Sequence, residues 1–330
     1  MKILLYEHLC ATLPADAAES CLVDEGWAML SSLADDLADL PDVEVHTLLA
    51  GGRTLPSTTS HPLTGSLLDT LAREATGADG VILIAPEMDG ELTNLARVVE
   101  ATSTPLLSCS STATELFSDK LRTAELLGEL SIPTFLANDQ VGTGRYVVKP
   151  RDGVGTLNTF LCDGPDLSRL FAEVFPDQPD DQLIVQPFWP GRTASTALVV
   201  DARGAPATLI AGAQHMSQQR EGMAQRFCYR GGSMPLPPEF QDRARQLVAR
   251  AFDLFPPVRG YLGVDLILGP DRDGSRDRIV EINPRLSTAY LGYRKLYPQA
   301  LTRRLLGQSV PLPPISAMPT IHYTSTGVIG

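Results

Sequence analysis

The sequence from Tyr261 to Arg285 reads YLGVDLILGPDRDGSRDRIVEINPR and consists of two apolar runs joined by a turn-rich segment. The first run alternates, so four of its apolar side chains share one face of a predicted strand: Leu262, Val264, Leu266 and Leu268. Asp265 therefore lies on the opposite face. In the second run, Glu281 and Asn283 are two residues apart, so their side chains point the same way. Both predicted strands thus carry polar side chains in apolar surroundings.

The two runs form a predicted β-hairpin, because GPDRDGSRD between them is rich in turn residues. If Leu268 pairs with Arg278, then Asp265 is opposite Glu281, and these carboxylates meet Asn283 on one surface. Mg²⁺ binds carboxylate oxygens together with the phosphates of a nucleotide, so this set suits one or two such ions. The alternative is a hairpin whose acidic residues only face water, which is common at charged tips. It fits Asp265 and Glu281 less well, because a buried carboxylate needs a partner.

Two further motifs place lysines where phosphates are commonly bound. YVVKPRDGVGT (146–156) delivers Lys149 on a strand, and its glycines leave a loop whose backbone amides can approach phosphate oxygens. SDKLRTAELLGEL (118–130) predicts a helix with Asp119 or the preceding serine as N-cap and Lys120 in its first turn. Each motif is weak alone, because a glycine turn and a solvated lysine are ordinary features.

The segment LIVQPFWPGRTAS (183–195) is an apolar strand that ends at Gln186 and then turns at Phe188. Such a hinge can offer backbone groups to an adenine ring. By itself, an ordinary edge strand ending in a turn explains this stretch equally simply.

Composition limits the class of protein. The chain has 330 residues, 43% hydrophobic content and a formal net charge of −12, which disfavours sequence-independent binding of nucleic acid. No apolar stretch approaches the length of a membrane helix, and MKILLYEHLC has no secretory h-region, so we expect a cytoplasmic protein that does not enter the membrane. The five cysteines form no CxxC pair, which indicates reduced thiols rather than a disulfide framework or a zinc site.

The order of predicted elements indicates an α/β part followed by an α+β part. The first part has predicted strands at 2–6, 43–49, 80–85 and 105–108 and helices at 25–40, 67–75 and 91–101. This alternation favours a parallel sheet with helices on both faces, and SSTATE after it looks like a connection. The later part has predicted strands at 146–148, 159–161, 183–187, 196–200, 208–213, 261–268 and 278–282 and a helix at 239–252, which indicates a largely antiparallel sheet. PLPPISAMP (311–319) predicts an extended surface segment.

Taken in order, SDK, VVKPRDGVGT, IVQPFWPG, YLGVDLIL and EINPR resemble the ATP-grasp superfamily over its whole nucleotide site, from Ser118 to Arg285. Within that superfamily, DEGWAML, IVQPFWPGRTAS and EINPRLSTAYLGYR resemble the tyramine–glutamate ligase branch of methanofuran biosynthesis. The resemblance implies an ATP-grasp fold with an N-terminal Rossmann-like pre-ATP-grasp domain (1–107), a small central subdomain with the phosphate loop (108–182) and a C-terminal subdomain with the metal site (183–330).

The resemblance also implies a role for each motif residue. Lys120 and Lys149 hold the α- and β-phosphates and the adenine edge of ATP, Gly153, Val154, Gly155 and Thr156 close over the triphosphate, Gln186 and Phe188 flank the base, Asp265, Glu281 and Asn283 bind Mg²⁺ or, alternatively, Mn²⁺, and Arg285 faces the reacting carboxylate. One departure is the hinge, which reads QPF where many relatives have an acidic residue after the glutamine, so no ribose contact is implied there.

The chemistry implied is the joining of a carboxylate to an amine, through an acyl phosphate, with release of ADP and phosphate. Arg285 and Lys149 are the catalytic candidates, and glutamate and tyramine are the substrates that the resemblance suggests. Glutamate has a second carboxylate that needs a cation, for which an arginine of the polar stretch 214–232 or one beyond the metal strand is a candidate: Arg220, Arg226, Arg230 or Arg294. Glu7 and Glu25, after the first strand, are candidates for a substrate ammonium.

Two other classes of protein stay open at this point. A kinase with the same ATP site would phosphorylate a hydroxyl, and an ATP-binding module would not turn over at all. No Ser/His/Asp or Cys/His arrangement is recognisable, which agrees with a reaction that needs no side-chain nucleophile. The expected partners are small-molecule carboxylates and amines, and a homodimer is left open as the assembly.

Overall fold

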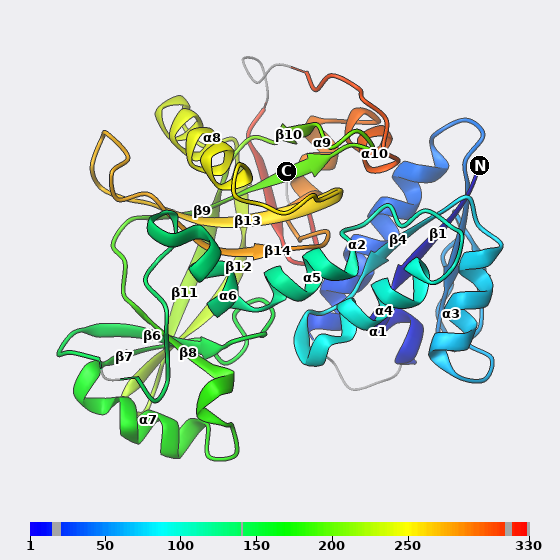
Figure 1. Cartoon of the computed structure of the whole chain (residues 1–330). Coiled ribbons are helices and arrows are strands. Elements are labelled where there is room, and N and C mark those ends of the chain that lie inside the picture. Colours follow the sequence, from blue (N-terminus) through cyan, green and yellow to red (C-terminus); the bar gives the residue numbers. More distant parts are fainter. Residues whose placement is uncertain (15–20, 140, 314–318, 329–330) are drawn as a thin grey trace.

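The computed structural model describes residues 1–14, 21–139, 141–313 and 319–328 (Figure 1). The first part of the chain contains β1 (Lys2–Glu7), α1 (His8–Thr12), α2 (Cys21–Ala38), β2 (Glu44–Leu48), β3 (Thr59–His61), α3 (Leu67–Thr76), β4 (Gly80–Ile84) and α4 (Glu91–Glu100). It is followed by α5 (Ser111–Ser118), α6 (Lys120–Leu127), β5 (Phe135–Leu136), β6 (Arg145–Pro150), β7 (Phe160–Asp163), α7 (Leu167–Val174) and β8 (Leu183–Pro187).

The remaining elements are β9 (Arg192–Val200), β10 (Pro206–Thr208), β11 (Gly212–Glu221), β12 (Ala224–Met234), α8 (Pro238–Phe252), β13 (Gly260–Leu268), β14 (Arg278–Asn283), α9 (Tyr290–Leu296), α10 (Ala300–Leu305), β15 (Ile321–Thr324) and β16 (Gly327–Val328). Of the predicted extended segment 311–319, residues 314–318 lie outside the described residues. Among the described residues, no helix combines the length and the apolar character that crossing a membrane requires.

The N-terminal part is a parallel sheet in the order β3-β2-β1-β4. The inner strand β1 has apolar side chains on both faces. Ile3 and Leu5 pack in the core that includes α2, whereas Leu4 and Tyr6 pack with α3 and α4. The predicted parallel sheet with helices on both faces is therefore confirmed. Figure 1 shows this layered unit in blue and cyan beside the second sheet.

The second sheet is antiparallel and follows the path β14-β13-β9-β11-β12-β7-β6-β8-β5. The strands β10 and β15 pair with β9 and β12, and β16 pairs with β15. This confirms the predicted antiparallel α+β portion. The helix α8 packs Leu247 and Val248 against Leu262 and Leu266 of β13, so the face of β13 that alternation predicted to be apolar is the buried one.

Three local predictions differ from the structure. The predicted strand 208–213 is interrupted, since β10 ends at Thr208 and β11 begins only at Gly212. Between them, the carbonyl of Leu209 accepts a hydrogen bond from the hydroxyl of Thr196 instead of pairing with a strand backbone.

SSTATE is not a connection: Ser110 accepts a hydrogen bond from the backbone N–H of Ala113, at 3.3 Å, and the helix α5 begins at Ser111. The predicted strand 105–108 is reduced to a single parallel bridge between Leu106 and Val81, because the chain leaves the sheet for α5 directly afterwards.

The division of the chain at 107/108 and 182/183 stays a prediction. Immediately after the second boundary, β8 pairs with β6 and β5 and contributes Leu183 and Val185 to the core that holds Val148 and Phe160. The strand β8 therefore packs with the strands that precede it in the chain.

The polar stretch 214–232 forms most of a long hairpin, β11–β12, which the sequence did not indicate. Its turn is at Gly222, which has a φ of 58°. The hairpin lacks an apolar alternation because much of it is only half-buried or exposed. Backbone pairing with β9 on one side and β7 on the other holds it in the sheet instead.

The loop that joins β13 to β14 is held to α8 by Asp277, which directly precedes β14. This carboxylate is 5% exposed, accepts the backbone N–H of Gly269 at 2.8 Å and binds Nε of Arg243 at 2.9 Å and its Nη2. Because the two strands carry Asp265 and Glu281, this contact helps fix the position of both.

We expect Asp277→Ala to lower the free energy of unfolding by about 3–5 kcal/mol, because it leaves the Arg243 charge largely buried without its partner. Urea unfolding followed by circular dichroism measures it. Asp271→Ala is the matched control, because Asp271 pairs with Arg276 at the exposed tip of the same hairpin. Equal losses in the two variants would contradict the buried role of Asp277.

Candidate active site

The two predicted carboxylates meet on the hairpin β13–β14. Asp265 is opposite Glu281, and Gly263 is opposite Asn283. The pairing was predicted from a register with Leu268 opposite Arg278, and this register is wrong, because Arg278 is opposite Ile267. A bulge supplies one extra residue on β14, so Asp265 still faces Glu281 rather than the residue before it.

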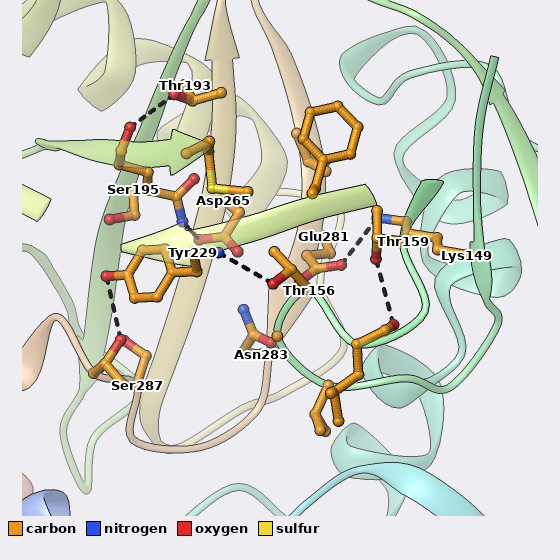
Figure 2. Close-up of a pocket in the computed structure, with 18 of the residues that line it drawn as sticks. Lys149, Thr156, Thr159, Thr193, Ser195, Tyr229, Asp265, Glu281, Asn283 and Ser287 are labelled. Carbon is orange, nitrogen blue, oxygen red and sulfur yellow. Dashed lines mark hydrogen bonds and ion pairs between the residues drawn. The ribbon is translucent and has the colours of Figure 1, made fainter. Parts of the chain in front are cut away.

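The lysine of the first glycine-containing motif contacts this pair. Lys149 on β6 donates a hydrogen bond from Nζ to Oε2 of Glu281 at 3.0 Å, and both side chains are buried (Figure 2). Lys120, at the start of α6, has its Nζ 3.9 Å from the same oxygen and also bonds the carbonyl of Gly153. Its helix is capped by Asp119, as predicted, which accepts the N–H groups of Leu121 and Arg122. Two lysines from separate elements therefore share one carboxylate.

Burial and the charges of neighbouring groups together shift the pKa values of these residues. Burial and the charge of Glu281 raise the pKa of Asp265 to about 7. Burial also favours protonation of Glu281, but the charges of Lys149 and Lys120 outweigh it and hold its pKa below the usual range. Burial lowers the pKa of Lys120, although Glu281 opposes this shift. Nearby positive charge thus stabilises the ionised form of both carboxylates, which is the electrostatic character of a cation site.

Gln214 also contacts Asp265, and it was not identified from the sequence. Its Nε2 donates to Oδ1 of Asp265 at 2.9 Å, and its backbone carbonyl accepts a hydrogen bond from the hydroxyl of Thr193 at 2.9 Å. The signal was missed because Gln214 belongs to the stretch that lacks an apolar alternation. Only the pairing of β11 with β9, the neighbour of β13, brings it to Asp265.

A cavity of about 640 Å³ runs from Lys149, Asp265 and Glu281 to the carboxyl ends of β1 and β4 in the parallel sheet. It is lined by most of the predicted site residues: Glu25, Lys149, Val154, Gly155, Thr156, Gln186, Phe188, Arg230, Asp265, Glu281, Asn283 and Arg285. Two more candidates for substrate groups, Glu7 and Arg226, line it as well. Lys120 and Gly153 do not line it, and Nζ of Lys120 donates a hydrogen bond to the carbonyl of Gly153.

Two of the predicted substrate residues are not at the cavity. Arg294 on α9 makes a two-point ion pair with Asp36 of α2, at 2.8 and 2.6 Å, and so joins the two sheets' helices. Arg220 is exposed near the tip of the hairpin β11–β12, where it bonds the carbonyl of Gly222. The structure therefore does not bring these two arginines to the cavity: Arg294 is already paired with Asp36, and Arg220 lies near the tip of the hairpin.

The loop 152–156 has contacts on three sides. The side chain of Asp152 accepts the backbone N–H of Asp89 at 3.0 Å, and the hydroxyl of Thr156 accepts that of Tyr229 at 3.2 Å. Val154 is 3% exposed, so the loop also has an apolar anchor. Gly155 has a φ of 57°, which favours glycine.

The hinge after β8 forms another side of the cavity. Gln186 is buried, and its Nε2 donates to the hydroxyl of Thr134 at 2.9 Å. Phe188 is 37% exposed, and the guanidinium of Arg145 lies 4.4 Å from the centre of its ring. A partly exposed aromatic ring at a cavity mouth suits the stacking of a flat ligand.

The donor set suits a metal ion that has other ligands as well. No group of three or more His, Cys, Asp or Glu side chains is arranged to hold a metal anywhere in the described ranges. Asp265, Glu281 and Asn283 offer two carboxylates and one amide, which do not by themselves fill the coordination of a metal ion. Such a partial oxygen set fits Mg²⁺, which retains waters and binds the phosphates of a substrate.

The last predicted residue, Arg285, follows β14 and lines the cavity. Its Nε and Nη2 both lie 2.9 Å from Oε2 of Glu87, which comes from the loop after β4 in the other sheet. Glu87 was not identified from the sequence, because a single glutamate after a strand gives no signal of its partner 198 residues away.

Comparison with known proteins agrees with this arrangement. Residues 117–289 match the family model for the ATP-grasp domain, and residues 53–114 match that for the pre ATP-grasp 3 domain. The tyramine–L-glutamate ligase of Methanocaldococcus fervens is 26% identical over 218 residues, which are 66% of this chain and 62% of that protein. The chain thus spans about three fifths of the length of the curated relatives it matches.

Two solved structures share the fold. An ATP-grasp superfamily protein of Archaeoglobus fulgidus superimposes with a TM-score of 0.71 and 22% identity, over 98% of this chain and 92% of that one. The N5-carboxyaminoimidazole synthetase of Staphylococcus aureus complexed with ADP has a TM-score of 0.67 and 13% identity, over 94% and 78% of the two chains. Because the ATP-grasp domain model matches more than half of its residues and the fold agrees throughout, this chain belongs to the ATP-grasp family.

Proposed function

We propose that this chain is an ATP-dependent ligase that joins a carboxylate to an amine through an acyl phosphate, with release of ADP and phosphate. The observation that carries the proposal is the convergence of Lys149, the Asp265–Glu281 pair and Arg285 on one cavity that reaches both sheets. Phosphoryl transfer to a carboxylate needs positive charge around the moving oxygens, and this cavity concentrates the groups that supply it.

The nucleotide is proposed to lie between the hinge and the loop 152–156. Gln186 and Phe188 face its base, and the backbone of Val154, Gly155 and Thr156 faces the phosphates. Lys149 reaches them directly from the cavity wall. Lys120 does not line the cavity, but it contacts Glu281 and the carbonyl of Gly153, so we propose that it adds positive charge and holds the loop.

Asp265, Glu281 and Asn283 would hold Mg²⁺ against the phosphates. When bound, the ion neutralises charge on the phosphate oxygens and orients them. The chain's own part is to keep Glu281 ionised through Lys149 and to orient Asp265 through the amide of Gln214. Relatives of known structure were solved with ADP or with its magnesium salt, which supports this assignment.

The acid substrate is proposed to lie beside Arg285. Its carboxylate oxygen attacks the γ-phosphorus of ATP, the bond from that phosphorus to the bridging oxygen of ADP breaks, and an acyl phosphate forms. Nitrogen of the amine then attacks the acyl carbon, and Arg285 stabilises the negative oxygen that develops. The carbon–phosphate bond breaks, phosphate leaves and an amide remains.

The substrates proposed are L-glutamate and tyramine, or a similar amine, in the synthesis of a methanofuran-type cofactor. Support comes from the relatives that match 66% of this chain, which are tyramine–L-glutamate ligases. Arg226 and Arg230 line the cavity and can bind the second carboxylate of glutamate. The Nε of Arg226 is buried and has no hydrogen-bond partner among the described residues, and its Nη1 lies 3.4 Å from Oε1 of Glu221.

The amine is proposed to bind where the cavity meets the parallel sheet. Glu25, in the first turns of α2, lines this end together with Glu7, and burial raises the pKa of both carboxylates. Apolar side chains of Leu22, Met29 and Ile84 line the same end. Carboxylates beside an apolar wall suit an ammonium group attached to an apolar body.

The reaction itself provides the first test. With Mg²⁺, ATP, L-glutamate and tyramine, we expect a glutamyl amide together with ADP and phosphate, rather than AMP and pyrophosphate. Hydroxylamine in place of the amine should trap the acyl phosphate as a hydroxamate. Appearance of AMP, or release of ADP only with an alcohol, would replace the ligase by an adenylating enzyme or a kinase.

Glu281→Gln tests the metal assignment. We expect ADP formation to fall by about 100-fold or more, because the lost charge weakens Mg²⁺ binding at nearly unchanged side-chain volume. Asp271→Asn, at the exposed tip of the same hairpin, is the control and should retain full turnover. Circular dichroism on the same samples checks the fold, and near-normal turnover of a folded Glu281→Gln would overturn the assignment.

Glu25→Gln tests the amine site. We expect the KM for tyramine to rise by about 10- to 100-fold, since a hydrogen bond to a charged group is lost, while the KM values for ATP and glutamate stay unchanged. Hydroxamate formation from hydroxylamine, which is uncharged at neutral pH, should also be unaffected. Asp24→Asn, its exposed neighbour on α2, is the control. A rise in the KM for glutamate instead would place the ammonium of the acid substrate at Glu25.

A further inference from the structure

Arg285 is held by contacts that use only part of its hydrogen-bonding capacity. Nε donates to Oε2 of Glu87 at 2.9 Å, Nη2 lies 2.9 Å from the same oxygen, and Nη1 donates to the carbonyl of Leu286 at 3.1 Å. Each terminal nitrogen of a guanidinium carries more than one N–H, so Nη1 and Nη2 keep donors for a ligand. Because Arg285 lines the cavity, these donors are available to an oxygen bound there.

Glu87 reaches Arg285 from the other sheet. It lies in the loop after β4, separated from the strand by Ala85 and Pro86, which line the cavity. Its side chain is 4% exposed, and no group among the described residues bonds its second oxygen, Oε1. The ion pair with Arg285 is therefore the contact that compensates this buried charge.

Other carboxylates compete for the same guanidinium. Glu25 and Glu281 are near enough to Arg285 to favour its charged form, although neither makes a hydrogen bond to it among the described residues. Among the side chains of the described residues, only that of Glu87 makes a hydrogen bond to Arg285. This contact therefore opposes displacement of the guanidinium toward the other carboxylates.

The loop that carries Glu87 also contacts the phosphate side of the cavity. Asp89 has a φ of 55°, a left-handed conformation that is uncommon for a residue other than glycine. In this conformation its N–H donates to the side chain of Asp152, at the start of the loop 152–156. One short loop after β4 thus binds both the arginine and the phosphate loop of the other part of the chain.

We propose that Glu87 is a positioning residue: it holds the guanidinium of Arg285 so that its free N–H groups face the acyl oxygen of the reacting carboxylate. This inference rests on the proposed function, because Arg285 is assigned to that oxygen. A misplacement of about 1 Å at a reacting group costs on the order of 100-fold in rate. Loss of Glu87 therefore lowers kcat, whereas the affinity for nucleotide depends on other residues and is retained.

A double-mutant cycle on the full chain tests this, with hydroxamate formation as the assay and ADP affinity measured by calorimetry. Glu87→Gln is expected to lower kcat by about 10- to 100-fold with ADP affinity unchanged. In the Arg285→Ala background, Glu87→Gln is expected to change kcat by less than about twofold, because its effect passes through the arginine. Glu87→Asp keeps the charge, is expected to restore part of the rate and replaces Glu87→Gln if that variant does not fold.

Asp36→Asn is the matched control. Asp36 of α2 forms an ion pair with Arg294 of α9 and so also joins the two parts of the chain. Unlike Arg285, Arg294 is not at the cavity. It is expected to lower thermal stability without lowering kcat. A loss of kcat equal to that of Glu87→Gln would show that any such ion pair has this effect and would overturn the proposal.

The remaining outcomes separate this proposal from the function on which it rests. Unchanged kcat in Glu87→Gln, or a full additional loss in the Arg285→Ala background, overturns the positioning role while wild-type turnover upholds the ligase. If the wild-type chain forms no hydroxamate with any acid and no ADP, the proposed function fails, and the positioning role fails with it.

Discussion

The site depends on the burial of two carboxylates, Asp265 and Glu281, directly opposite each other on adjacent strands. Their repulsion in an environment of low dielectric constant would favour protonation of at least one of them. Lys149 and Lys120, which come from β6 and α6, supply the opposing charge. The chain must therefore bring three segments together before the charges balance, and the antiparallel sheet and the helix α6 are the scaffold that does so. A bound cation would satisfy the demand that remains.

The parallel sheet contributes more than a support for the second sheet. The carboxyl ends of β1 and β4 close the cavity with Glu7 and Ile84, and the loop after β4 delivers Glu87 to Arg285. The two parts of the chain are also joined by the ion pair of Asp36 with Arg294, at a distance from the cavity. Among the described residues, this interface thus has two buried or half-buried ion pairs, and that of Glu87 with Arg285 is the one that involves a cavity residue.

Several features of the site were accessible from local pattern alone. Alternation in 261–268 identified the face of Asp265, and the spacing of Glu281 and Asn283 put both on one side of their strand. The cap at Asp119 and the strand that carries Lys149 were also predicted. These inferences hold because each depends on a few neighbouring residues, whose backbone period is fixed by stereochemistry. The register of the hairpin was wrong, because a bulge adds one residue without any clear mark in the sequence.

The sequence by itself determined the two kinds of sheet, the polar faces of β13 and β14 and the family to which the motifs point. Only the tertiary structure decided that Gln214 orients Asp265, that Glu87 holds Arg285, and that Arg294 and Arg220 lie away from the cavity. The physical reason is the range of the interactions. Periodicity and capping act within a few residues of the chain, whereas the partner of a buried charge is chosen by whichever opposite charge the folded chain brings within hydrogen-bonding distance, 198 residues away in the case of Glu87 and Arg285.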